Sequence, residues 1–164
     1  MRSSAAVEPT TIAVTRRYAF PAAHVLRHPS FSDPENQRVY GKCANPSGHG
    51  HNYGIEVSVT GPVDERMGWV VDPAVLDATF DAQVRGRFAH RLLNDLPEFS
   101  TQVPTAENLA RVIYASLAEP LADCSSACLV EVRVVETRRN SFTYRPSPTE
   151  TRSEPTTQMS QPTP

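Results

Sequence analysis

Residues 43–60 read CANPSGHGHNYGIEVSVT, a stretch that joins a glycine-rich approach, a pair of histidines and an alternating segment. From His51 to Thr60 apolar and polar residues alternate, which is typical of a β-strand with one buried face. His49 and His51 stand two positions apart on extended chain, so their side chains project from the same face. Two imidazoles placed in this way can hold one zinc ion.

A second strand is predicted upstream, because residues 11–20 alternate in the same manner. The segment Phe20-Pro-Ala-Ala-His24 ends this strand, and antiparallel pairing would bring His24 beside His51. Three histidines with one open position are typical of a catalytic zinc site. The alternative is that the His-x-His pair forms only a polar strand edge. The glycine-rich approach, the nearby cysteine and His24 favour the metal site.

Cys43 precedes the histidine pair and admits two interpretations. As a fourth ligand it would close the coordination shell and make the zinc structural. As a base or nucleophile beside the metal it would be a thiolate, which the zinc charge and the adjacent Lys42 would both favour. The residues alone leave both interpretations open.

Two helices are predicted after the second strand. Asp72 is a suitable N-cap with Pro73 at the first helical position, and Thr105 caps a second helix after Pro104. Strands are predicted over residues 129–137 and 141–145, joined by a short turn. The apolar residues of the two helices recur at helical spacing: Val75, Leu76, Phe80 and Val84, then Leu109, Val112, Ile113 and Leu117.

The predicted order is therefore β-β-α-α-β-β, an α+β domain in which the helices cover one face of a sheet. Residues 21–48 lack periodicity and are rich in Pro, Ser, Asn and Gly; a loop of this length is usually functional. We expect residues 1–10 to be a flexible N-terminus, residues 11–145 to be the domain, and residues 146–164 to be a disordered tail rich in Pro, Ser and Thr.

Glu136 continues the apolar face that Val130, Val132 and Val134 form in the third predicted strand. A carboxylate on such a face is either solvated beyond the sheet edge or paired with a ligand. A ligand with an amidine-like edge, such as a pterin, donates two hydrogen bonds to one carboxylate. Thr105 and Glu107 would add contacts at the helix start, unless they serve only capping and dipole interactions.

Composition excludes several classes of protein. The chain has 164 residues, 39% of them hydrophobic, which suits one globular domain. With 16 basic and 18 acidic residues the net charge is −2, so nucleic acid is not an expected partner. Neither a signal peptide nor a transmembrane stretch is expected, and three cysteines form no disulfide framework. These features predict a cytoplasmic protein without a membrane partner.

Taken together, the motifs resemble the 6-pyruvoyl-tetrahydropterin synthase and 6-carboxytetrahydropterin synthase family over about residues 13–144. The resemblance is carried by Phe20-Pro-Ala-Ala-His24, Glu35-Asn36, Tyr40-Gly-Lys-Cys43, Asn45-Pro46, Gly48-His-Gly-His-Asn-Tyr53, Leu93-Asn-Asp-Leu96, Pro104-Thr-Ala-Glu-Asn108 and Glu136-Thr137. It implies the tunnelling fold (T-fold), in which a four-stranded antiparallel sheet carries two helices on one face. It also implies a homohexamer of two trimers with active sites between subunits.

The resemblance further implies a lyase acting on 7,8-dihydroneopterin triphosphate. Zn²⁺ would be held by His24, His49 and His51, and would polarise the hydroxyls of the substrate side chain. Loss of triphosphate gives a 6-pyruvoyl product; loss of acetaldehyde gives the 6-carboxy product used in 7-deazaguanine (queuosine) biosynthesis. The five-residue gap between Cys43 and His49 favours the first product, whereas an arginine-rich, bacterial type of composition favours the second.

The resemblance also assigns roles around the metal. Cys43 and His90 would transfer protons, and Glu136 would anchor the pterin with help from Thr105 and Glu107. We nominate Arg27 and Lys42 for the triphosphate, since both flank the predicted site and phosphates favour such charges. Solvated surface charge is the alternative for both.

One position departs from the family pattern, which has Asp-His where this chain has Ala89-His90. The aspartate orients and supports the proton-transferring histidine, which alanine does not. Either another carboxylate takes its place, or the chain is a zinc-containing pterin-binding protein with reduced or altered catalysis. A structural zinc module with Cys43 as fourth ligand is a further alternative.

Overall fold

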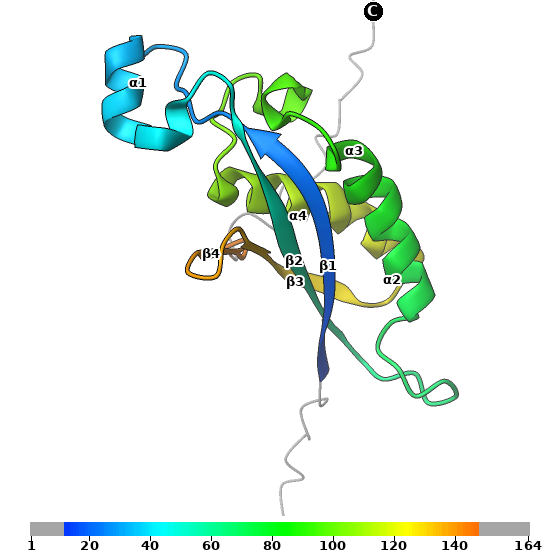
Figure 1. Cartoon of the computed structure of the whole chain (residues 1–164). Helices are drawn as coiled ribbons and strands as arrows, with labels where there is room; N and C mark the ends of the chain where they lie inside the picture. The colour runs from blue at the N-terminus through cyan, green and yellow to red at the C-terminus, as the bar shows by residue number, and fades with distance from the viewer. Residues whose placement is uncertain (1–11, 148–164) are drawn as a thin grey trace, which may run out of the picture.

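A computed structural model of the chain describes residues 12–147, in which one antiparallel sheet carries helices on one face (Figure 1). The strands lie in the order of the sequence, so each one pairs with its predecessor. They are β1 (Ile12–His24), β2 (His49–Gly61), β3 (Cys128–Val135) and β4 (Ser141–Tyr144). The register of the longest pair sets Phe20 opposite Tyr53 and His24 opposite His49.

The helices that follow β2 begin where the sequence predicts. The Asp72 side chain accepts from the backbone N–H of Ala74 at 2.8 Å, and α2 (Pro73–Phe80) continues through a π-turn, η2 (Asp81–Arg85), into α3 (Gly86–Phe88). Thr105 caps the long helix α4 (Ala106–Cys124). Two short 3₁₀ turns, η3 (Leu93–Asp95) and η4 (Pro97–Phe99), connect α3 to α4. The predicted α+β class and the order of the main elements are confirmed.

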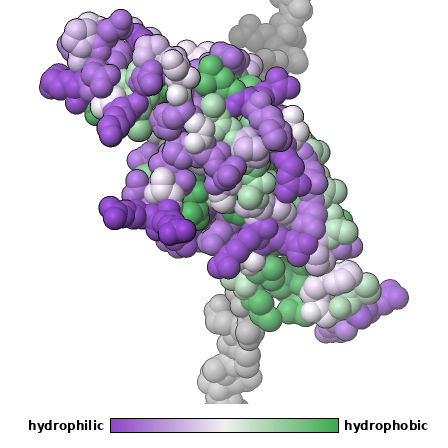
Figure 2. Space-filling view, viewed as in Figure 1, coloured by the Kyte–Doolittle hydropathy of each residue, from purple (hydrophilic) through white to green (hydrophobic). Residues whose placement is uncertain are grey.

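The two faces of the sheet differ in chemistry. Apolar residues of β2 and β3 pack beneath α2 and α4 to form the core, among them Ile55, Val57 and Val134, none of which is exposed. In Figure 1 the strands pass in front of α4, and Figure 2, in the same view, shows hydrophilic side chains over much of the opposite face. There Glu56 accepts from Arg17 at 3.0 Å and Arg133 at 3.4 Å across three strands.

The segment between β1 and β2 is more ordered than the sequence predicts. β1 extends to His24, and the expected loop contains α1 (Asp33–Tyr40) followed by a 3₁₀ turn, η1 (Gly41–Ala44). Ser32 and Glu35 form a capping box at the start of α1. Because α1 has a polar sequence and projects from the body, it lacks the apolar stripe by which a helix is recognised.

The third strand corrects the predicted face of Val130. A bulge lies opposite Ser58 and Val59 of β2, so that Val59 pairs with Leu129 rather than with Val130. Leu129 therefore packs on the core, and Val130 is out of phase with Val132 and Val134. The strand ends at Val135, which places Glu136 just beyond it, where its N–H donates to the carbonyl of Asn140 at 3.1 Å.

Two further expectations concern the ends of the chain and its thiols. Residues 1–10, and all but the first two residues of the tail predicted over 146–164, lie outside the described residues. From the sequence, Cys124 and Cys128 lie near a turn and a strand start, where inert packing is expected, but the structure leaves both exposed. None of the helices between residues 12 and 147 is long and apolar enough to cross a membrane.

Candidate metal and pterin site

Three histidines converge at one end of the helix-covered face. His24 ends β1, His49 begins β2, and the register places the two opposite each other. His51 lies two residues further along β2, hence on the same face. One ring nitrogen from each histidine falls within 4.8 Å of the other two, which makes the trio suitable for a metal ion.

The His24 ring is held in a defined orientation by a residue from the other half of the chain. The carbonyl oxygen of Pro104 lies 2.8 Å from His24 Nδ1 and can only accept, so Nδ1 carries the proton. The lone pair is thereby on Nε2, which faces His49 Nε2 at 2.9 Å. A metal-ligating histidine commonly donates its second ring N–H to a carbonyl in this way.

The remaining ring nitrogens support a metal site as well. His49 Nδ1 and His51 Nε2 are buried without a hydrogen-bond partner among the described residues. Burial lowers the pKa of His24 to about 4, although the hydrogen bond to Pro104 acts in the opposite direction. Burial and the nearby His51 lower the pKa of His49 as well. Neutral imidazoles are the form that binds metal, so the donor set fits such an ion.

Glu136 lies beside the histidine cluster rather than in open solvent. Its carboxylate is 3.7 Å from His51 Nε2 and 3.9 Å from His24 Nε2, and only 15% of the side chain is exposed. The solvated alternative for Glu136 is therefore wrong in this structure. These distances place a carboxylate next to the three histidines, where it can receive the polar edge of a ligand.

Cys43 approaches the site from the projecting arm, which we define as residues 26–47. Its carbonyl accepts from the N–H of Leu26 at 2.8 Å, which ties η1 to the chain just beyond His24. Burial raises the pKa of the Tyr53 hydroxyl, and the charges of Glu136 and Cys43 raise it further. Within residues 12–147, the group of potential ligands comprises only the three histidines and leaves Cys43 out.

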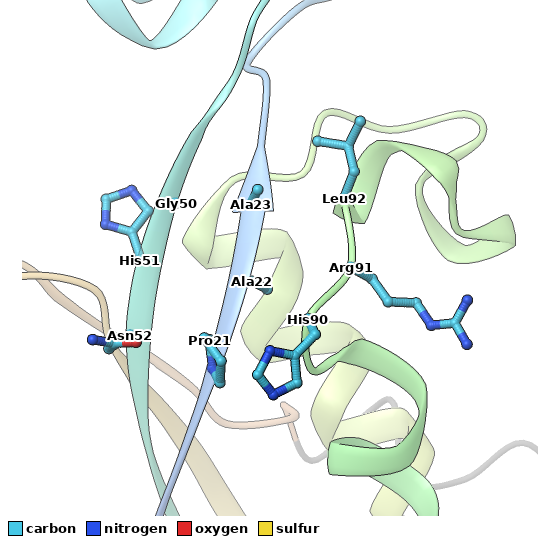
Figure 3. A pocket seen from close by; sticks show the side chains of 9 residues that line it. All are labelled: Pro21, Ala22, Ala23, Gly50, His51, Asn52, His90, Arg91 and Leu92. Carbon is cyan, nitrogen blue, oxygen red and sulfur yellow. The ribbon is translucent and has the colours of Figure 1, made fainter.

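His90 and His51 line one hollow, although β1 lies between their side chains (Figure 3). This hollow of about 430 Å³ is also lined by other residues of β1 and β2, but Cys43 is not part of that lining. Figure 3 shows the His51 ring projecting away from the segment that carries His90, with β1 between them. Ala89 packs against the core, and His90 follows with a φ of 61°, a left-handed conformation that is uncommon outside glycine.

The other nominated residues are dispersed around the site. The Thr105 hydroxyl accepts from the N–H of Asn108 as the α4 cap, next to the carbonyl that holds His24. Glu107 is exposed and lines a hollow against β4. Arg27 pairs with Asp33 in the arm, whereas Lys42 is exposed beside Cys43. One chain thus brings Glu136 to the histidines but not Glu107 or Arg27.

Several residues of the site were not assigned a role from sequence. Pro104 orients His24, and the hydroxyl of the fully buried Tyr53 lies 3.2 Å from His24 Nδ1. Asn94 binds the backbone of Val25, the residue after His24, through both its amide oxygen and its amide nitrogen. The only sequence signal for these residues is their presence in the motifs of the resemblance, because their partners are remote in the chain.

Comparisons with known proteins agree with this geometry. Residues 13–147 match the family model described as 6-pyruvoyl tetrahydropterin synthase. The chain is 39% identical over 133 residues to 6-pyruvoyl tetrahydrobiopterin synthase of Drosophila melanogaster, which covers 80% of this chain and 78% of that protein. The human enzyme of the same name is 38% identical over 133 residues, covering 80% of this chain and 90% of its own.

The solved structures lead to the same family. The structure of Caenorhabditis elegans 6-pyruvoyl tetrahydropterin synthase matches with a TM-score of 0.79 and 36% identity, covering 87% of this chain and all of that chain. A four-stranded antiparallel sheet with helices on one face is the T-fold of these proteins, as expected. The chain therefore belongs to the 6-pyruvoyl tetrahydropterin synthase family, a family of lyases.

Proposed function

We propose that this protein is a zinc-dependent lyase that converts 7,8-dihydroneopterin triphosphate to 6-pyruvoyl tetrahydropterin. The observation that carries the proposal is the trio His24, His49 and His51, whose ligand nitrogens lie within 4.8 Å of one another beside Glu136. The proposal is also supported by several relatives that are named 6-pyruvoyl tetrahydrobiopterin synthase and are 37–39% identical to this chain.

Zinc is the metal that three imidazoles with an open position suit best. When bound, it would polarise the hydroxyls of the substrate side chain and so acidify the neighbouring C–H bonds. His24 would hold the ion through Nε2, because its Nδ1–H is committed to the carbonyl of Pro104.

Recognition of the pterin falls to Glu136. The 2-aminopyrimidinone edge of a pterin carries two donors that match one carboxylate. Glu136 is buried enough to exclude much of the competing water, and its place beside the histidines would orient the three-carbon side chain toward the metal. Thr105 and Glu107, at the start of α4, are proposed as further contacts, and Lys42 and Arg27 as contacts of the triphosphate.

Proton transfer is assigned to Cys43 and His90. A thiolate at Cys43 would remove a proton from the side chain, and His90 would return protons as triphosphate leaves. Within one chain the two residues do not share a hollow. We therefore propose that they meet between subunits of a homohexamer of two trimers, which mass measurement in solution would test. The free thiols of Cys43, Cys124 and Cys128 suit a reducing, cytoplasmic setting.

The deciding experiment incubates zinc-loaded protein with 7,8-dihydroneopterin triphosphate and identifies the products by mass. We expect a 6-pyruvoyl tetrahydropterin and free triphosphate. Release of acetaldehyde with a 6-carboxy product would overturn the pyruvoyl assignment and move the protein to 7-deazaguanine (queuosine) synthesis. Pterin binding without turnover would reject the lyase proposal.

The second candidate is a zinc-containing pterin-binding protein with weak catalysis, and Ala89 is the observation that favours it. Ala89 faces the core, and no carboxylate among the described residues pairs with the His90 ring. If the missing aspartate limits turnover, Ala89→Asp should raise kcat, since general acid–base help is worth about 10²–10⁴-fold.

The matched control is Ala82→Asp, which adds the same charge at an exposed position of the neighbouring turn. An increase confined to Ala89→Asp would support the second candidate. Equal rates in the parent and in both variants would show that His90 functions without an adjacent carboxylate.

A further inference from the structure

On the edge of β1 that does not face β2, a segment that begins at His90 pairs with the strand. The N–H of His90 donates to the carbonyl of Pro21 at 2.7 Å, and the N–H of Ala23 donates to the carbonyl of Arg91 at 2.9 Å. Ala23 and Leu92 form a parallel bridge directly after these two contacts. Residues 90–94 thus run along the last residues of β1 as a short strap, a name we keep for this segment.

The side chain of Asn94 continues this pairing to Val25, because its amide makes the two hydrogen bonds that a backbone peptide group would make. Its Oδ1 accepts from the N–H of Val25 at 2.8 Å, and its Nδ2 donates to the carbonyl of Val25 at 2.9 Å. Val25 is only 8% exposed, so neither backbone group has ready access to water. Losing the amide would leave a buried donor and a buried acceptor without partners.

His24 stands between two residues that the strap binds, Ala23 and Val25. Its own ring is 1% exposed and is fixed on one side by Pro104. A displacement of the backbone at Val25 would therefore change the direction in which His24 Nε2 points. Outer-sphere groups that orient a ligand typically contribute about 10–100-fold to metal affinity.

We infer that Asn94 is a positioning residue for the metal ligand His24, acting through the backbone of Val25. The inference rests on the metal site of the proposed function and extends it to a residue that touches neither metal nor substrate. It also means that the strap carrying His90 and the strand carrying His24 are held in one register by the same set of bonds.

The test measures zinc affinity of the full chain by competition with a chromophoric chelator. Asn94→Ala should weaken zinc binding by about 10–100-fold. Asn94→Asp keeps an oxygen that accepts from the Val25 N–H, but it replaces the amide donor by a carboxylate oxygen, which repels the Val25 carbonyl. This variant should therefore also weaken zinc binding. The absorption spectrum of the cobalt(II)-loaded variants should change, because ligand geometry at the ion has changed.

The matched control is Gln102→Ala, which also removes a side-chain amide bound to a backbone carbonyl, that of Glu98 at 2.7 Å, but one that does not touch β1. It should leave zinc affinity and the cobalt spectrum unchanged.

The outcomes separate this inference from the function it rests on. If the parent chain binds no zinc, the proposed metal site itself is wrong. If the parent binds one zinc per chain and Asn94→Asp, folded by circular dichroism, binds it equally well with the same cobalt spectrum, the positioning role alone is overturned. Weaker binding in both Asn94 variants, with Gln102→Ala unaffected, supports it.

Discussion

The helix-covered face of the sheet has two chemically opposite ends, and each contains side chains that are withdrawn from water. The apolar end consists of the residues around Ile55, Val57 and Val134. The polar end consists of His24, His49, His51, Tyr53 and Glu136. Ile55 is 0% exposed and His24 only 1%. Both ends are built from the same strands, so burial alone does not distinguish the core from the site.

What differs is how the buried groups are satisfied. At the apolar end, side chains gain from leaving water and from close packing. At the polar end, two imidazole nitrogens are buried without partners among the described residues, and a carboxylate lies 3.7 Å from one of them. Buried polar groups without partners are unfavourable, so their accumulation on a core face indicates a place kept for a ligand.

The largest expected effect comes from removing one ligand at the polar end. His24→Ala should abolish zinc binding and lyase activity, a loss beyond the roughly 10–100-fold that an outer-sphere change causes. Metal content by elemental analysis and product formation would measure it. His28→Ala, in the arm and outside the cluster, is the control and should retain one zinc per chain. Full zinc content in His24→Ala would contradict the proposed ligand set.

A smaller loss is expected at Cys43, which we place beside the metal but not on it. Cys43→Ala should lower kcat by about 10²–10⁴-fold, the usual contribution of a general acid or base, while zinc content stays at the parent level. Steady-state kinetics with elemental analysis distinguish the alternatives. Loss of zinc from Cys43→Ala would instead establish the cysteine as a fourth ligand and the site as structural.

At the apolar end, a substitution should affect stability and leave the metal in place. Ile55→Ala removes a fully buried side chain and should lower the free energy of unfolding by about 2–5 kcal/mol. Urea denaturation of the zinc-loaded protein would report this change. Zinc affinity below the unfolding transition should match that of the parent; a weaker affinity would show that the two ends are mechanically coupled.

Acid should destabilise the metal-free protein through the polar end. The pKa of His24 is lowered from 6.5 to about 4 in the fold, so the unfolded chain takes up a proton first as the pH falls. Stability is therefore greatest above pH 6.5 and should decline by about 3 kcal/mol toward pH 4. Urea titrations of chelator-stripped protein test this; His24→Ala should flatten the decline, whereas a parent curve without slope would refute it.

The sequence-based predictions succeed where an element depends on residues that are close together in the chain, and they fail where it depends on remote ones. Alternation in residues 51–60 and the caps Asp72 and Thr105 are local signals, and the structure confirms the elements they predict. The helix α1 was not predicted, although Ser32 and Glu35 form a capping box, because its polar sequence has no apolar stripe. The bulge that removes Val130 from the core face depends on pairing with β2 and has no signal in β3 itself.

The sequence by itself determined the fold class and the family, together with the histidines that can hold a metal. These follow from periodicity and from short spacings, such as the two-residue step that puts His49 and His51 on one face. Only the tertiary structure decided that Pro104 orients His24, that Glu136 lies beside the cluster, and that Cys43 does not line the hollow that His90 lines within one chain. The physical reason is that each of these contacts joins segments remote in sequence, whose distance is set by strand register and helix packing.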